Sequence, residues 1–329
     1  MTRRELVGLG LAALSAPLLA PPWAWAQTRY PERPIRLIIP FPPGGVNDAI
    51  GRPWADKMKG LLGTVVVENM GGAGGAVGAL AAARAQPDGY TLLLGSGGTQ
   101  VIIPIASSQP QYDPVKTFEP ISLLGITAIC IAVHPSVPVQ TLGELIAYAK
   151  ANPGKLSYGS AGSGTMTHLT GELLKVLAGT SGIVHIPYRG AGPALTDAIS
   201  GHIPMITPNV TGQVIELSKT GKLRILAVTT PTRVAAAPEI PTAIEAGLPN
   251  MISQNFVALL APAKTPKEII EQIAQATRAG LSDPELQQLF HAAAFEPRPD
   301  SGPAHARMFL EDEVARWSPI IKSVNLKLD

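Results

Sequence analysis

The chain has 329 residues, a formal net charge of +2, and charged residues at only 15% of its positions. Because the charge is balanced and no basic run is interleaved with aromatic residues, the composition argues against nucleic acid as a partner. The single cysteine, Cys130, excludes a disulfide within the chain, and its apolar neighbours in "ITAICIAVH" predict a buried side chain. A chain of this length is expected to form two domains of ordinary size.

The first 26 residues have the pattern of a cleaved export signal. Arg3 and Arg4 precede an apolar run, and "AWA" at 24–26 is typical of a cleavage site. The apolar run is shorter than the ~20 residues of a membrane span. The paired arginines favour the twin-arginine export route, although Glu5 and Leu6 depart from its usual motif. We therefore expect residues 1–26 to be removed on export.

Apolar runs typical of strands alternate with helical patterns along most of the chain. Strands are expected at 35–40, 64–68, 91–95, 121–133, 156–159, 183–187, 203–207, 223–229 and 256–261. Helices are expected at 48–62, 74–85, 142–151, 165–178, 191–200, 211–220, 265–279, 283–293 and 303–323. Capping boxes predict helix starts at Thr141/Glu144, Thr242/Glu245, Thr265/Glu268 and Ser282/Glu285. The alternation predicts an α/β fold with parallel sheets, and the terminal helices are expected to pack on an earlier sheet.

Two apolar runs are candidates for strands that cross between two lobes. They are the long run 121–133 and the run 223–229. Two α/β lobes that are joined by crossing strands leave a cleft between them. A ligand is expected in that cleft, at the carboxyl ends of the strands.

Several loops share one design, in which a strand leads through small residues into a helix. In "IIPFPPGGVNDAIGR", Gly44 and Gly45 allow positive φ and leave space above the backbone, and Asn47 or Asp48 is the predicted N-cap. The same design recurs at 95–100, 159–169 and 187–192. Amide groups at a helix N-terminus favour a carboxylate or a phosphate. A tight turn without a ligand explains any single loop, but the recurrence favours an anion site.

The motifs of common enzymes are incomplete in this chain. Ser96, Ser160 and Ser163 lie in glycine-rich turns, but none has glycine at both the −2 and +2 positions of a nucleophile elbow. No complete dinucleotide or P-loop motif occurs, and no pair among the six histidines has metal-ligand spacing. The sequence therefore predicts no enzyme activity, no cofactor and no metal site. For His168 and Arg189 the sequence leaves a ligand contact and a structural or solvated position both open.

Eight sequence blocks occur in the order of a known family. The chain resembles the periplasmic solute-binding receptors of tripartite tricarboxylate transporters, the Bug-type family, over essentially all of its mature length. The blocks are "YPERPIRLIIPFPPGGVND", "VVVENMGGAGG", "PDGYTLLLGS", "YDPVKTFEPISLL", "GKLSYGSAGSGTMTHLTGELLK", "IVHIPYRGAGPALTDAISG", "GKLRILAVTT" and "IPTAIEAGLP".

The resemblance implies a fold and a function. The fold is the α/β, two-lobed periplasmic-binding-protein type II arrangement, with crossing hinge strands and a cleft between the lobes. The function is capture of a small organic carboxylate in the periplasm and its delivery to a tripartite tricarboxylate-type membrane permease. A ligand-dependent partner of a sensor kinase ectodomain would have the same pocket, so the sequence leaves both roles open. A monomer is expected, because a clamp must present both lobes to the permease.

The resemblance also implies the site. In relatives, backbone amides and small hydroxyls of two loops hold the ligand carboxylate, and these loops correspond to 40–48 and 160–165 here. Four candidates for the cleft wall are added, because each follows or ends a strand: Phe41, Tyr188, Asn209 and Phe256. The expected ligand-binding residues are Phe41, Pro42, Gly44, Gly45, Asn47, Asp48, Ser96, Ser160, Ala161, Gly162, Ser163, Gly164, Thr165, His168, Tyr188, Asn209 and Phe256. Lobe one is expected to comprise residues 27–126 and 230–329, and lobe two residues 127–229.

Overall fold

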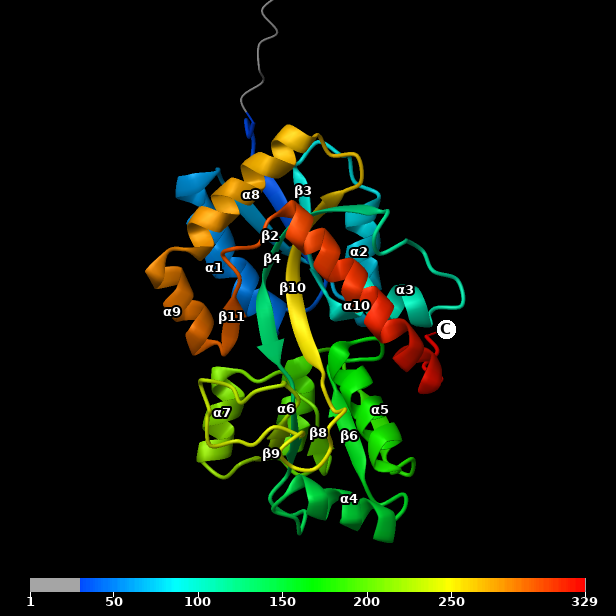
Figure 1. Ribbon diagram of the computed structural model, residues 1–329. Coiled ribbons are helices and arrows are strands. Elements are labelled where there is room, and N and C mark those ends of the chain that lie inside the picture. Colours follow the sequence, from blue (N-terminus) through cyan, green and yellow to red (C-terminus); the bar gives the residue numbers. More distant parts are fainter. Residues whose placement is uncertain (1–29, 329) are drawn as a thin grey trace, which may run out of the picture.

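The computed structural model describes residues 30–328 and contains two β-sheets, each with helices packed around it (Figure 1). The export signal expected at residues 1–26 lies outside the described residues. Within residues 30–328, no helix is both long and apolar enough to cross a membrane.

The first sheet has six strands in the order β11-β4-β10-β3-β1-β2. Its strands are β1 (Ile35–Ile39), β2 (Val65–Asn69), β3 (Thr91–Ser96), β4 (Phe118–Ala128), β10 (Gln254–Pro262) and β11 (Phe295–Pro297). Its helices are α1 (Val46–Leu61), α2 (Ala76–Ala83), α3 (Ile103–Ala106), α8 (Lys267–Leu281), α9 (Pro284–Ala292) and α10 (Pro303–Ser323). Short turns of other helical type lie at Ala73–Gly75 and Gly98–Ile102. Figure 1 shows α1, α8 and α9 grouped on one side of this sheet and α10 lying across it.

Strand periodicity explains why helices cover both faces of this sheet. Side chains of a strand alternate between its two faces. Leu37, Leu92 and Leu94 belong to the cluster with α1, α8 and α9, whereas Ile38 and Leu93 belong to the cluster on the opposite face. Because both sets are apolar, each face requires a helical cover to exclude water.

The second sheet has five strands in the order β7-β6-β8-β5-β9. Its strands are β5 (Cys130–Val133), β6 (Ser157–Ser160), β7 (Val184–Pro187), β8 (Met205–Ile206) and β9 (Arg224–Val228). Its helices are α4 (Leu142–Ala151), α5 (Met166–Ala178), α6 (Ala191–Ile199) and α7 (Gly212–Lys219). Cys130 is buried, as its neighbours in the sequence predict.

Both sheets are mixed rather than parallel, which corrects the expectation from the sequence. β1 runs parallel to β2 and β3, but β10 is antiparallel to both of its neighbours. In the second sheet, β5 is antiparallel to β8 and β9. The reason lies in the crossings, because the βα strands run toward the junction, and a strand that enters a lobe from the junction, as β5 and β10 do, must run against them.

The chain crosses between the sheets at two places that touch each other. The run predicted as one strand at 121–133 contains β4 and β5, which are separated at Ile129. The run 223–229 does not make the return crossing, because β9 stays within the second sheet and β10 begins only at Gln254. The hydroxyl of Thr229 donates to the carbonyls of Ile129 (2.9 Å) and Ser253 (2.6 Å). The outgoing and returning segments are therefore tied together at one buried point.

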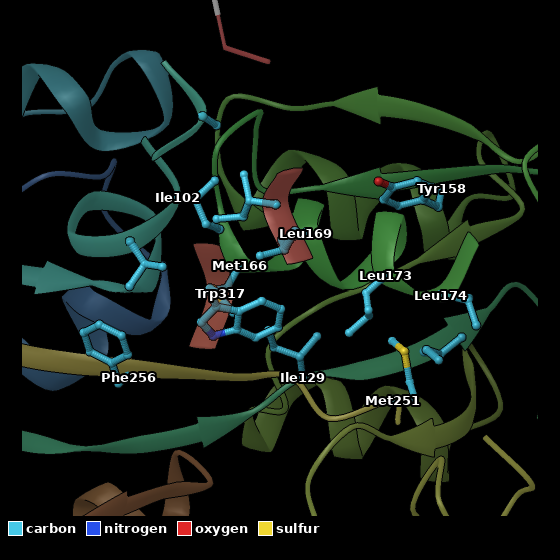
Figure 2. Close-up of a cluster of buried hydrophobic side chains, with 14 of the residues drawn as sticks. Ile102, Ile129, Tyr158, Met166, Leu169, Leu173, Leu174, Met251, Phe256 and Trp317 are labelled. Carbon is cyan, nitrogen blue, oxygen red and sulfur yellow. The ribbon is translucent and has the colours of Figure 1, made fainter. Parts of the chain in front are cut away.

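A hydrophobic cluster fills the space between the two sheets (Figure 2). Met166 and Leu169 of α5 lie beside Trp317 of α10, and Phe256 of β10 lies close by. The Trp317 side chain is fully buried, and its Nε1 donates to Glu313 within the same helix (2.9 Å). The terminal helix thus packs on the first sheet, as expected, and also reaches the second.

Several predicted helix starts are shifted. Gly45, rather than Asn47 or Asp48, is the N-cap of α1. Thr141 caps α4 as predicted, but α8 starts after Pro266 and α9 is capped by Asp283. In α9, Pro284 takes the first helical position, so the residue before it, Asp283, is the cap. In α8, Pro266 is itself the N-cap with a non-helical ψ of 136°, so the helix starts at Lys267. Thr242 and Glu245 do exchange hydrogen bonds (3.1 and 2.8 Å), but they close a turn rather than starting a helix.

Candidate functional site

A cavity of about 120 Å³ lies where the loops of the two sheets meet. Its walls come from the loops after β1, β3, β6, β7 and β8, and from the first residues of β10. The lining residues are Phe41, Pro42, Pro43, Gly44, Gly45, Val46, Asn47, Ser96, Gly98, Ala161, Thr165, Met166, Thr167, Arg189, Gly190, Ala191, Gly192, Pro193, Asn209 and Asn255. None of these carries a carboxylate, and Arg189 supplies the one cation among them.

Three helices begin at this cavity. Lining residues include Val46 and Asn47 at the start of α1, Met166 and Thr167 at the start of α5, and Ala191 and Gly192 at the start of α6. The first amide groups of a helix have no acceptor within the helix and carry a partial positive charge. The cavity therefore favours an anion.

Asp48 holds the loop after β1 in place through hydrogen bonds. Its carboxylate accepts hydrogen bonds from the amide of Gly44 (3.2 Å), from Arg52 (3.0 Å) and from Asn69 Nδ2 (3.0 Å). Asn69 Nδ2 also donates to the carbonyl of Phe41 (3.0 Å). Burial acts to raise the pKa of Asp48, but the hydrogen bonds from Arg52 and Asn69 hold this pKa below its usual range. Asp48 does not line the cavity, and its geometry is that of a residue that positions the loop.

The loop after β6 uses its hydroxyls internally. Ser160 Oγ accepts the amide of Gly162 (3.2 Å), and Thr165 Oγ1 donates to the carbonyl of Gly162 (2.7 Å) and caps α5. Thr167 Oγ1 accepts the amide of Ala161 (3.0 Å). Gly162 and Gly164 have φ values of +133° and +78°, which favour glycine. These contacts set the loop backbone, and Met166 and Thr167 at the start of α5 line the cavity.

A stacked pair of histidines supports the same loop. The rings of His168 and His185 lie 3.8 Å apart between centroids, with an interplanar angle of 11°. His168 Nδ1 accepts the amide of Gly164 (3.3 Å), and His185 Nε2 lies 2.7 Å from Ser160 Oγ. Burial, reinforced by nearby positive charge, lowers the pKa of His168 to about 4 and that of His185 to about 3. Both rings are therefore neutral near pH 7, which the acceptor role of His168 requires.

A larger groove, of about 920 Å³, adjoins the cavity and shares Phe41, Pro42, Pro43, Ala161, Arg189 and Gly190 with it. Gly162, Ser163 and Tyr188 line this groove rather than the cavity. The hydroxyl of Tyr188 donates to Asp197 Oδ2 (2.7 Å), so that its ring is fixed at the groove wall.

Of the seventeen residues expected in the site, nine line the cavity and three more line the groove. The other five line neither: Asp48, Ser160, Gly164, His168 and Phe256. Phe256 is buried in the hydrophobic cluster, edge-on to Phe309. A Cβ at Gly164 would meet the side chains of Leu328 and Ile103, not the cavity.

Other lining residues were missed from the sequence. The sequence marks 187–192 as a loop of the same design and leaves a ligand contact of Arg189 open, but Gly190, Ala191 and Gly192 are absent from the expected contacts although they line the cavity. Asn255 had no such signal, because a residue inside a strand faces the cavity or the core according to pairing alone.

Two α/β lobes that enclose a cavity at their junction define the class of bilobed solute-binding proteins. The solved structure of the periplasmic binding protein BugD has a TM-score of 0.84 against this chain and 33% identity, and it covers 91% of this chain and 99% of that one. The two-lobed periplasmic-binding-protein arrangement implied by the sequence is thereby confirmed.

The family follows from the sequence comparison. Residues 50–326 match the family described as "Tripartite tricarboxylate transporter family receptor". Protein BugT of Bordetella pertussis, strain Tohama I, is 33% identical over 328 residues, which are 99% of this chain and 98% of that protein. The chain belongs to the tripartite tricarboxylate transporter family of receptors and is of Bug type. The eight sequence blocks quoted above predicted that the chain belongs to this family.

Two similar structures contain ligands. MatC from Rhodopseudomonas palustris, solved with bound malate, is 27% identical with a TM-score of 0.84 and covers 89% of this chain and 100% of that one. A second R. palustris protein, solved with adipate, is 30% identical with a TM-score of 0.85 and covers 91% of this chain and 99% of that one. The family and these structures are those of periplasmic solute-binding receptors, not of enzymes.

Proposed function

We propose that this receptor captures a small organic carboxylate between its lobes and delivers it to a tripartite tricarboxylate-type permease. The observation that carries the proposal is the convergence of three helix N-termini on a cavity without any acidic lining residue. One helix end favours an anion by roughly 0.3–1 kcal/mol, and a partly buried geometry by more. The malate and adipate bound in the similar structures are both small dicarboxylates.

The proposed contacts are those residues expected from the sequence that also line the cavity or the adjoining groove. They are Phe41, Pro42, Gly44, Gly45, Asn47, Ser96, Ala161, Gly162, Ser163, Thr165, Tyr188 and Asn209. We assign a supporting role to Asp48, Ser160, Gly164 and His168, because each holds one of the two loops through hydrogen bonds. Phe256 packs in the core and is left out of the proposed contacts.

We further propose that one lobe comprises residues 27–126 and the returning chain from about residue 254, and that the other lobe extends from 127 to about 253, later than the limit of 229 expected from the sequence. In support, Val234, Ala237 and Ile240 pack in one cluster with Cys130 and Val228 of the second sheet, and β10 begins only at Gln254. Residues 1–26 are proposed to direct export through the twin-arginine route.

Calorimetric titration of the purified protein with mono- and dicarboxylates tests the capture step. At least one acid is expected to bind more tightly than ~1 mM, about −4 kcal/mol, with the neutral diamide of the same acid as the control. Binding of the diamide alone, or of none of the acids, would contradict the proposal. Pull-down of membrane partners with and without ligand then separates a permease from a sensor kinase ectodomain.

A further inference from the structure

A loop of the second sheet, residues 163–166, lies directly against loops of the first sheet. A Cβ at Gly74 would collide with the carbonyl oxygen of Ser163. A Cβ at Gly98 would lie 2.9 Å from the carbonyl oxygen of Gly164. Side-chain carbons do not approach a backbone oxygen so closely, so glycine at 74 and 98 is what lets the two backbones touch. We call this contact of Gly74 and Gly98 with residues 163–166 the lobe seam.

Apolar contacts continue the lobe seam, and no polar bond crosses it. A Cβ at Gly164 would lie 2.8 Å from Leu328 Cδ1. The backbone amide of Leu328 donates to the carbonyl of Ala106 (3.0 Å), which fixes this residue to the first lobe. Within residues 30–328, no hydrogen bond or ion pair joins 71–76 or 97–98 to 162–166. The lobes can therefore separate at the seam without leaving a polar group unpaired.

The lobe seam lies between the cavity and the groove. Gly98 and Thr165 line the cavity of about 120 Å³. Gly74 and Ser163 line the groove of about 920 Å³. Separation of the lobes at the seam would join these two spaces, and a small molecule in the cavity would then have a way out through the groove.

We propose that the lobe seam is the gate through which the ligand enters and leaves by way of the groove, and that Gly74 sets how far the lobes close. This inference rests on the proposed function, because it concerns how that ligand is held. A ligand that contacts both lobes favours the state in which the seam is closed. A side chain at 74 would hold the lobes apart, and the apparent affinity falls with the fraction of the protein that can close.

Gly74→Ala tests the inference, with Gly221→Ala as its matched control. Gly74 and Gly221 have φ values of +66° and +72°, so alanine strains the backbone alike at both positions. A Cβ at Gly221 would meet no atom within 4 Å, whereas a Cβ at Gly74 meets the other lobe. The two variants are therefore expected to lose similar stability in urea.

Their affinities, in contrast, should differ. Calorimetry with succinate, malate, glutarate and adipate on the unaltered protein selects the acid that binds most tightly, and this acid is the probe. Gly74→Ala is expected to bind the probe at least tenfold more weakly and to release it faster, whereas Gly221→Ala should stay within about threefold of the unaltered protein.

Small-angle X-ray scattering shows whether the lobes are held apart. The probe is expected to decrease the radius of gyration of the unaltered protein, and to decrease that of Gly74→Ala by less than about half as much. Gly97→Val is a second variant, at a residue with an ordinary φ of −53° that lines neither the cavity nor the groove. A Cβ at Gly97 would lie 2.7 Å from Met166 Sδ of the other lobe, so this variant should show the same two losses without backbone strain.

The outcomes separate this inference from the proposed function. Unaltered affinity and full compaction in folded Gly74→Ala, or in Gly97→Val where it alone folds, would overturn the inference and leave carboxylate capture standing. Binding of the probe to the unaltered protein without any decrease in its radius of gyration would do the same. If none of the four acids binds more tightly than ~1 mM, carboxylate capture itself fails, and the inference falls with it.

Discussion

Gly45 shows how a single residue can keep the cavity open. It is the N-cap of α1 with φ −84° and ψ 175°, an extended backbone that any residue adopts. A Cβ at this position would meet no atom within 4 Å. Glycine at 45 is therefore not required by the backbone, and what it leaves free is space beside the first amides of α1.

Substitution of Gly45 should consequently separate binding from stability. Gly45→Val is expected to weaken carboxylate binding at least tenfold, about 1.4 kcal/mol, because its side chain occupies the space for the anion. The melting temperature should stay within about 2 °C of the unaltered protein, since no backbone strain is introduced. Gly143→Val, near the start of α4 and away from the cavity, is the matched control for binding. Unchanged affinity in Gly45→Val would show that the anion binds elsewhere.

At the scale of elements, the start of α5 and the end of β6 are joined through the histidine pair. His168 lies on α5, His185 on β7, and both hold the loop between β6 and α5. The charged and titratable groups that face the pair are Glu172 and Lys175 of α5 and Tyr158 of β6. Lys175 is paired with Glu172 at 2.9 Å, so this ion pair adds little net charge near the rings.

This arrangement predicts that acid destabilises the fold. Above pH 6.5, the two histidines are neutral in both the folded and the unfolded protein. Between pH 6.5 and about 4, His168 binds a proton in the unfolded chain but not in the folded protein. Stability therefore falls as pH drops through this window, by at most about 1.4 kcal/mol per pH unit for one histidine. In urea unfolding between pH 7 and 5, His168→Gln should show a shallower slope, and His291→Gln, at an exposed position in α9, should not. An unchanged slope in His168→Gln would assign the acid sensitivity to other groups.

At the scale of the whole molecule, contacts at the junction between the sheets hold the two lobes against each other. A first-sheet loop and a second-sheet loop touch at the adjoining groove, where a Cβ at Gly74 would collide with the carbonyl oxygen of Ser163. The hydrophobic cluster in Figure 2 continues this contact with Trp317 and Met166. The crossing segments themselves are joined by Thr229, which is fully buried.

Removal of the Thr229 hydroxyl should therefore loosen the junction. Thr229→Val keeps the shape but leaves the carbonyl of Ser253 without its donor, whereas the carbonyl of Ile129 keeps the backbone amide of residue 229 (2.8 Å). The free energy of unfolding is expected to fall by about 1–3 kcal/mol, measured in urea. Thr220→Val is the matched control, because its hydroxyl bonds a helix carbonyl at an exposed site, and it should change stability by less than about 0.5 kcal/mol. Equal stability of Thr229→Val and the unaltered protein would contradict this role of the junction.

The sequence by itself determined the family, the alternation of strands and helices, and the glycine-rich loops that end at helix starts. These features depend on neighbouring residues, since Gly44 and Gly45 permit an open turn wherever the chain places it. The order of the strands within each sheet could not be predicted from neighbouring residues. That β10 lies between β3 and β4, and runs against both, depends on where the returning chain meets the first sheet.

Only the tertiary structure decided which side chains face the cavity. Phe256 was the candidate from the sequence, but Asn255 beside it lines the cavity, because successive residues of a strand point to opposite faces and the pairing with β4 sets which is which. Ser160 and Thr165 were expected to offer their hydroxyls to a ligand, yet these groups hydrogen-bond within their own loop. A short loop must satisfy its own buried polar groups first, and whether a hydroxyl remains free for a ligand is settled only when the chain has folded.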